Sequence, residues 1–335
     1  MAVENTTVED LHENEAAGTP GLTGPGTDQH GFVAHSHGGR SGDAVPAKSR
    51  AERPASFDVD VFPVPSGREE DWRFTPLDRL GGLLDGPASD AHLEWSSQLP
   101  DGVEVGTLAA DDPQRLSVPR PIDRVAALAV ARSDGSVVVR IPARAQLEKP
   151  VVLRLHGTGN DLVWGHVILD VGREASATVV VEHTGRARFG GVLSVLVGDA
   201  AHLRLACVQD WDPDAVHVAH VGSRLGRDAT LHSTQVTLGG DLVRVTETVE
   251  FSGTGGDATL NGVYFADPGQ HLEHRLFIDH GVPHCRSNVT YKGALQGEGA
   301  HTVWIGDVLI RAAAEGTDTY ELNRLIELQM EGAVG

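Results

Sequence analysis

The sequence predicts an all-β protein, a right-handed parallel β-helix (β-solenoid) with a small N-terminal helical region. The first observation is a series of short runs in which β-branched and polar residues alternate, each ended by Gly, Asp or Asn. Such runs are found at residues 136–141, 150–155, 177–183, 192–197 and 202–208. The second observation is that almost no helical pattern separates them, which excludes a doubly wound α/β sheet, because its parallel strands need crossover helices.

The third observation is an internal repeat. An Asp-Ala pair recurs at intervals of 29 residues, at Asp199, Asp228 and Asp257, and each pair opens an alternating strand after a glycine-containing turn. Regular spacing of a turn and a strand is typical of stacked coils, which bury their inward side chains only against their neighbours. A β-sandwich also has strands at regular intervals, so it stays an alternative on pattern alone.

The composition divides the chain into three regions. Residues 1–50 are rich in Gly, Glu, Asp, Thr and Ser, show no hydrophobic period, and are predicted to be a disordered leader. Residues 51–118 are predicted to form the small helical region, because leucines recur at helical spacing between Leu77 and Leu84. Residues 119–335 are predicted to be the β-helix core.

Charge and hydropathy exclude several classes of function. A formal net charge of -20 argues against a nucleic-acid partner, since binding the phosphate backbone requires Lys and Arg. No apolar run approaches the ~20 residues of a transmembrane helix. The acidic N-terminus lacks the basic start and apolar core of a secretory signal. We therefore expect a cytoplasmic protein that binds neither nucleic acid nor membrane.

The two cysteines, Cys207 and Cys285, fit a reducing compartment and no disulfide framework. They cannot supply the four thiolates of an ordinary iron–sulfur site within one chain, so a cluster held here would have to borrow ligands. Cys207 alternates with Leu203 and Leu205 and is predicted to face the core.

The densest group of potential metal ligands is found at His271, Glu273, His274, Asp279, His280, His284 and Cys285. On a strand, alternate residues share a face, so Glu273 belongs with His271 rather than with His274. His284 and Cys285 are the predicted metal ligands, provided that a turn brings them together. The alternative is a solvent-facing ladder of histidines, with Cys285 as an ordinary buried residue.

No catalytic residues are predicted, and we expect the chain not to be an enzyme. A Gly-x-Ser-x-Gly elbow, a phosphate-cradling GxxxxGK[ST] loop and a His-Glu-x-x-His zinc helix are all absent from the sequence. The main alternative is a β-helical carbohydrate-active enzyme, a polysaccharide lyase or hydrolase, which needs paired carboxylates across a groove. The acidic residues here lie mostly at turns, where Asp bonds its own backbone. A bare structural solenoid is a third possibility.

Two stretches of the sequence, PSGREEDWRFTPLDRL at residues 65–80 and a longer one at residues 278–324, are familiar. The first resembles the N-terminal signature of the SufB/SufD family of iron–sulfur cluster assembly proteins. Residues 278–324 resemble its β-helix signature, with family-like residues in the expected order at Ser287, Lys292, Gly293, Gly306, Val308, Ala314, Thr317 and Asn323. The likeness extends from roughly residue 60 to 324, and the short N-terminal region is more similar to the SufD branch than to SufB.

The resemblance implies a non-catalytic scaffold that pairs with SufB through the β-helices and works with the SufC ATPase during iron uptake and cluster assembly. It also implies that this chain alone binds no cofactor, and that a transient iron or iron–sulfur cluster is shared with SufB. After Asn323 the likeness stops, where the family continues with further coils and with helices that dock SufC. We therefore expect the β-helix to be incomplete at its C-terminal end and the SufC-docking region to be missing, through truncation or in a shortened natural variant.

Overall fold

The computed structural model describes residues 53–328, so the predicted leader at residues 1–50 lies outside the described part of the chain. The helices in this range are the 3-10 helices η1 (Val59–Val61), η2 (Leu77–Leu80) and η3 (Pro113–Leu116) and the α-helix α1 (Arg124–Arg132). The strands are β1 (Glu94–Gln98), β2 (Glu104–Ala109), β3 (Gly135–Ile141), β4 (Val151–Val171), β5 (Ser176–Val197), β6 (His202–Trp211), β7 (Val216–Leu225), β8 (Thr230–Thr237), β9 (Leu242–Phe251), β10 (Asp257–Ala266), β11 (His271–His280), β12 (Arg286–Gln296), β13 (His301–Ile310) and β14 (Asp318–Leu328). None of the helices between residues 53 and 328 is long and apolar enough to cross a membrane.

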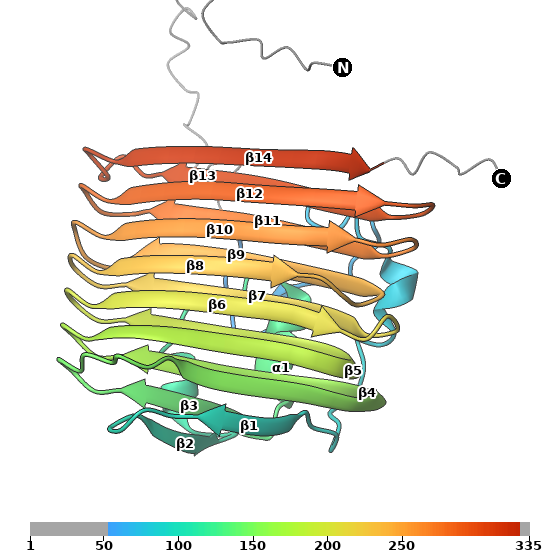
Figure 1. Ribbon diagram of the computed structural model, residues 1–335, viewed down its shortest axis with the longest axis horizontal. Helices are drawn as coiled ribbons and strands as arrows, with labels where there is room; N and C mark the ends of the chain where they lie inside the picture. The colour runs from blue at the N-terminus through green and yellow to red at the C-terminus, as the bar shows by residue number, and fades with distance from the viewer. Residues whose placement is uncertain (1–52, 329–335) are drawn as a thin grey trace, which may run out of the picture. The chain divides into compact units, whose positions relative to one another are not determined.

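The strands from β4 onward stack into two walls that enclose one apolar core (Figure 1). Strands β6, β8, β10, β12 and β14 follow one another in the first wall, here called the open wall, and β7, β9, β11 and β13 form the second, the covered wall. Strand β5 belongs to both, because its first half pairs with β6 and its second half with β7. Every pair along this stack is parallel, which confirms the predicted β-solenoid and excludes an antiparallel β-sandwich.

The register between open-wall coils is close to the sequence repeat, although Asp257 pairs with Thr230 rather than with Asp228. Four residues at or near the starts of successive open-wall strands lie side by side, namely His202, Thr230, Asp257 and Arg286. One residue further on, Leu203, Leu231 and Ala258 are aligned in the same way and are buried. Burying one leucine side chain fully stabilises a fold by about 1.5–3 kcal/mol, so a short repeat suffices to hold neighbouring coils together.

Two antiparallel strands cover the N-terminal edges of the stack. Strand β1 pairs with the first part of β4, and β2 pairs with β3. They occupy edges that would otherwise expose unpaired backbone groups. Both strands lie within residues 51–118, where the sequence predicted helices. The helices found there are three short 3-10 helices, and α1 follows just after, where the Asp123 side chain accepts a hydrogen bond from the backbone N–H of Ala126.

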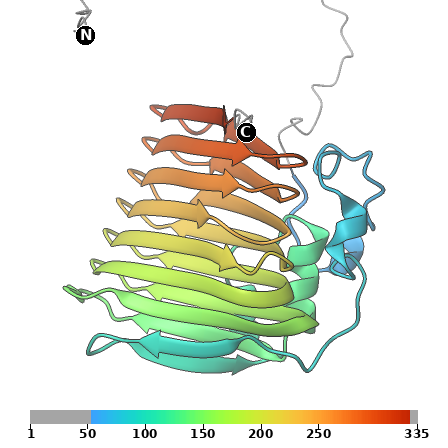
Figure 2. The same ribbon diagram turned by 45° about the vertical axis from the view of Figure 1, so that its right-hand side comes forward.

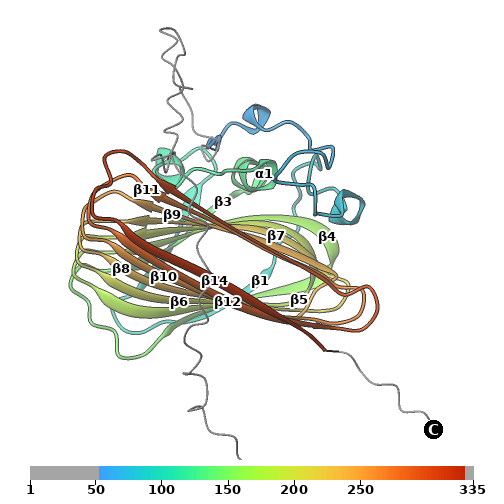
Figure 3. The same cartoon turned by 90° about the horizontal axis from the view of Figure 1, so that it is seen from above.

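An N-terminal segment, residues 53–84, lies with α1 over the outer face of the covered wall (Figures 2 and 3). Trp72 and Leu80 of this segment pack in one cluster with Val192 and Val216 of the wall. Strand β7 is therefore buried at nearly every position, whereas β6 of the open wall alternates between buried and exposed residues. Polar side chains on either face of the covered wall must consequently find partners within the protein.

Candidate functional site

The histidine-rich segment forms β11 and the turn after it, and the histidines of β11 lie in two environments. His271 and Glu273 face the N-terminal segment and contact each other. His274 and His280 face the interior, where they stack on Tyr264 and Phe251. The predicted grouping of Glu273 with His271 is therefore confirmed. The alternative of a solvent-facing histidine ladder is wrong for the residues of β11, because His271, His274 and His280 are all buried.

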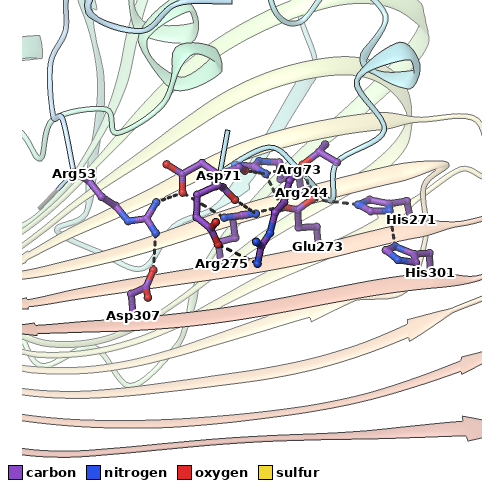
Figure 4. Close-up of polar contacts among 11 residues, drawn as sticks. Arg53, Asp71, Arg73, Arg244, His271, Glu273, Arg275, His301 and Asp307 are labelled. Carbon is purple, nitrogen blue, oxygen red and sulfur yellow. Dashed lines mark hydrogen bonds and ion pairs between the residues drawn. The ribbon is translucent and has the colours of Figure 1, made fainter. Parts of the chain in front are cut away.

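Glu273 is the centre of a buried ion network on the outer face of the covered wall (Figure 4). Its Oε1 accepts hydrogen bonds from Arg244 Nη1 and Arg275 Nε, both at 2.5 Å. Its Oε2 accepts a hydrogen bond from Thr75 Oγ1 at 2.7 Å and lies 3.2 Å from His271 Nε2. Burial alone would raise the pKa of Glu273, but its cationic neighbours, above all Arg244, lower the pKa well below its ordinary value. Glu273 is thus an anion at neutral pH.

Arg244 joins this network to the N-terminal segment. Its Nη1 also donates to the Asp71 carbonyl oxygen at 2.9 Å and to Thr75 Oγ1 at 2.8 Å. Its guanidinium carbon lies 4.0 Å from the ring centroid of Trp72, a cation–π contact. The stretch that resembles the family's N-terminal signature therefore docks on the covered wall through buried charges as well as through apolar contact.

Two further arginines hold the same segment at its ends. Arg53 pairs with Asp71 and, at 2.5 Å, with Asp307 Oδ2 of β13. Arg79 donates from Nη2 and Nε to the carboxylate of Asp241, at 2.6 and 3.1 Å. Ion pairs and hydrogen bonds thus connect the N-terminal segment to β9, β11 and β13 or to the turns that precede these strands.

His284 and Cys285, the predicted metal ligands, lie in the turn between β11 and β12. Cys285 is fully buried, its Sγ lies 3.6 Å from the carbonyl oxygens of Gly253 and Pro283, and burial raises its pKa. His284 is exposed and has a φ of 60°, in the left-handed region. The turn therefore directs one side chain into the core and leaves the other in solvent, so it does not bring them together as a pair. Their role as metal ligands stays a prediction.

The described part of the chain contains no three-ligand metal site. No group of three or more His, Cys, Asp and Glu side chains between residues 53 and 328 is arranged to hold a metal ion. Both cysteines are free thiols, and Cys207 faces the core as predicted, where burial raises its pKa. A cluster with four protein ligands would need side chains from outside residues 53–328.

The core contains a buried acid that the sequence analysis missed. Glu247 of β9 points inward, and its carboxylate accepts hydrogen bonds from Ser233 Oγ at 2.5 Å and from Tyr291 OH at 3.2 Å. Burial raises the pKa of Glu247. The alternation from Val243 to Phe251 places Glu247 on the apolar face of its strand, a signal that would have found it.

A surface groove of about 520 Å³ lies between the N-terminal segment and the outer faces of β9 and β11. Its lining includes two carboxylates, Glu250 and Asp279. Glu250 is paired with Arg224, and Asp279 is paired with Arg311 at 2.6 and 2.8 Å. Glycoside cleavage uses two carboxyl groups that face the substrate, one as acid and one as base or nucleophile. Since arginines engage both carboxylates, this groove does not present the free pair that the alternative enzyme function requires.

Comparison with known proteins identifies a family for the strands of the solenoid. Residues 154–334 match the family model described as SUF system FeS cluster assembly, SufBD core domain. The match begins in β4 and includes both walls. The fold and this match define the class, a β-solenoid protein of iron–sulfur cluster assembly.

The chain belongs to the SufBD family. It is 45% identical over 292 residues to an iron–sulfur cluster assembly SufBD family protein of Mycobacterium bovis, covering 84% of this chain and 73% of that protein. A Mycobacterium leprae protein of the same description is 44% identical over 297 residues, covering 86% of this chain and 75% of that protein. The iron–sulfur cluster assembly protein SufD of Escherichia coli is 23% identical over 292 residues, covering 76% of this chain and 68% of that protein.

Proposed function

We propose that this chain is the SufD-type scaffold subunit of an iron–sulfur cluster assembly complex and has no catalytic activity of its own. The observation that carries the proposal is the match of the SufBD core domain to both walls of the solenoid. The likeness to SufD of Escherichia coli supports the SufD type within the family. The arginine-paired carboxylates of the groove argue against the carbohydrate-active alternative.

In this proposal the chain pairs with SufB through the β-helices, and the SufC ATPase drives the assembly cycle. The outer face of the open wall supports such pairing, because the N-terminal segment does not cover it. Large apolar side chains are exposed there at Val263 of β10, and at Tyr320 and Ile326 of β14. The uncovered face is therefore accessible to another protein.

The iron or cluster is shared with SufB in this proposal rather than held by this chain alone. Two buried thiols cannot complete a four-ligand site, and His284 is exposed where a second chain can approach it. Free cysteines fit a reducing compartment, so we assign the protein to the cytoplasm.

The test is co-purification of the untagged chain with tagged SufB and SufC from the same source. Recovery with SufB is the expected result, followed by iron-dependent visible absorbance after anaerobic reconstitution of the complex with iron and sulfide. His284→Ala, compared with His92→Ala at an exposed position before β1, shows whether the predicted ligand contributes to that absorbance. Failure of the chain to associate with SufB, together with turnover of a polysaccharide, would replace the scaffold with the enzyme alternative.

A further inference from the structure

His271 and His301 form a pair at the end of the ion network (Figure 4). They lie side by side at the starts of β11 and β13. Their Nδ1 atoms are 3.0 Å apart, while the ring centroids are 4.9 Å apart and the ring planes are inclined by 13°. Because the nitrogens are much closer together than the centroids, the rings meet through their Nδ1 edges.

Glu273 determines which nitrogen of His271 carries a proton. A carboxylate anion only accepts hydrogen bonds, so its contact with His271 Nε2 requires the hydrogen on that nitrogen. A neutral His271 then has a lone pair on Nδ1, directed at His301. Metal-binding imidazoles are commonly held in this tautomer by a carboxylate on the opposite nitrogen.

The distance between the two Nδ1 atoms suits a shared metal ion. With imidazole nitrogens about 2.0–2.1 Å from a metal, two adjacent ligands lie about 3.0 Å apart at a right angle and about 3.4 Å apart at a tetrahedral angle. The observed 3.0 Å lies at the lower end of that range. An ion bound to both nitrogens lies to one side of the line between them, so the two rings keep this separation and turn to direct their lone pairs at the ion.

We propose that His271 and His301 form a two-histidine site for a divalent transition-metal ion, with Glu273 as its positioning residue. Imidazole ligands suit Fe²⁺, Co²⁺, Ni²⁺ and Zn²⁺. His271 is buried and His301 is exposed, so the ion arrives from the solvent side of β13 and keeps its other positions for water or for ligands of another molecule. Two protein ligands make a site that loads and releases its ion. The inference deepens the proposed function and rests on it in naming ferrous iron as the natural cargo.

The charges beside the pair are balanced. The ion network that supports His271 contains three arginines and three carboxylates, Arg53, Arg244, Arg275, Asp71, Glu273 and Asp307. No net positive charge of this network therefore opposes the approach of a cation.

The test is an anaerobic titration of the full, untagged chain with Co²⁺ alone, followed by visible absorption, and with Fe²⁺ alone, followed by calorimetry. We expect His301→Ala to lower the affinity of this site at least about tenfold. His301 is exposed, so the substitution preserves the fold, which circular dichroism checks. The matched control is His202→Ala, which removes an exposed histidine at the start of β6 and leaves binding unchanged. Every variant keeps the histidines of residues 1–50, so the difference reports position 301 alone.

Glu273→Gln tests the positioning role. We expect about 10- to 100-fold weaker binding, because the amide no longer requires the hydrogen on His271 Nε2. A changed spectrum of bound Co²⁺ at unchanged circular dichroism is the readout that a merely structural role of Glu273 would not move. If Glu273→Gln fails to fold, His301→Ala decides the proposal by itself.

Equal metal binding by the wild type, His301→Ala and His202→Ala would overturn the proposal. The co-purification experiment is independent of this result. A chain that binds no metal at the pair and still recovers SufB contradicts only the site. A chain that binds metal there and recovers no SufB contradicts only the proposed function.

Discussion

Replacement of Arg244 by methionine tests whether buried charge holds the N-terminal segment on the covered wall. Arg244 is among the largest fully buried side chains between residues 53 and 328. Methionine keeps an unbranched apolar chain of similar length, so the packing is largely preserved and the charge is lost. The substitution removes the hydrogen bonds to Glu273 and Thr75 and the cation–π contact with Trp72.

The expected magnitude follows from these contacts. Removing one partner of a buried ion pair costs about 3–5 kcal/mol, because the other charge stays buried. Glu273 keeps its contacts with Arg275 and His271, which moves the cost toward the lower end of that range. Loss of the contact with Trp72 contributes about 0.5–2 kcal/mol in the same direction. We therefore expect Arg244→Met to lower the free energy of unfolding by about 3–4 kcal/mol.

Urea unfolding, followed by far-UV circular dichroism and tryptophan fluorescence, measures this difference. The matched control is Arg204→Met, which removes an exposed arginine from the outer face of β6 and is expected to change the free energy of unfolding by less than about 0.5 kcal/mol. If Arg244→Met unfolds at the same urea concentration as Arg204→Met, the buried network does not stabilise the fold and the reasoning is refuted.

Three further predictions concern buried groups. Burial lowers the pKa of His166 to about 3 and that of His183 to about 4, whereas both side chains take up a proton near pH 6.5 in the unfolded chain. The urea midpoint should therefore fall as the pH drops from 6.5 toward 4. An equal midpoint at pH 7.5 and pH 5 would contradict this prediction. A Cβ atom at Gly293 would lie 2.0 Å from the ring of Tyr264, so Gly293→Val should lower the free energy of unfolding in urea by about 1–3 kcal/mol. Gly106→Val, whose Cβ atom would have its nearest neighbour at 3.8 Å, should lower that free energy by less. Burial raises the pKa of Cys207, so iodoacetamide should modify this thiol in urea and leave it intact in the native chain. Mass spectrometry measures the modification. Equal rates of modification in both conditions would place this thiol at the surface.

Local pattern predicted the solenoid and left a β-sandwich as the alternative. Asp199, Asp228 and Asp257 recur every 29 residues because each coil packs on the coil before it, which keeps the coils close to one length. The same reasoning could not find β1 and β2. Each is a short strand that becomes ordered by pairing with a partner further along the chain, and a few residues carry no period that reveals such a partner.

The candidate site shows the same division. Period-two alternation correctly placed His271 with Glu273 and Cys207 in the core, because alternate side chains of a strand share a face whatever lies against it. Alternation could not show that the N-terminal segment contacts β11, or that His301 in the next coil of the covered wall meets His271. The sequence by itself determined the coil and the two faces of each strand. The tertiary structure decided which face is buried and which side chains meet across coils, because both depend on contacts between residues far apart in the chain.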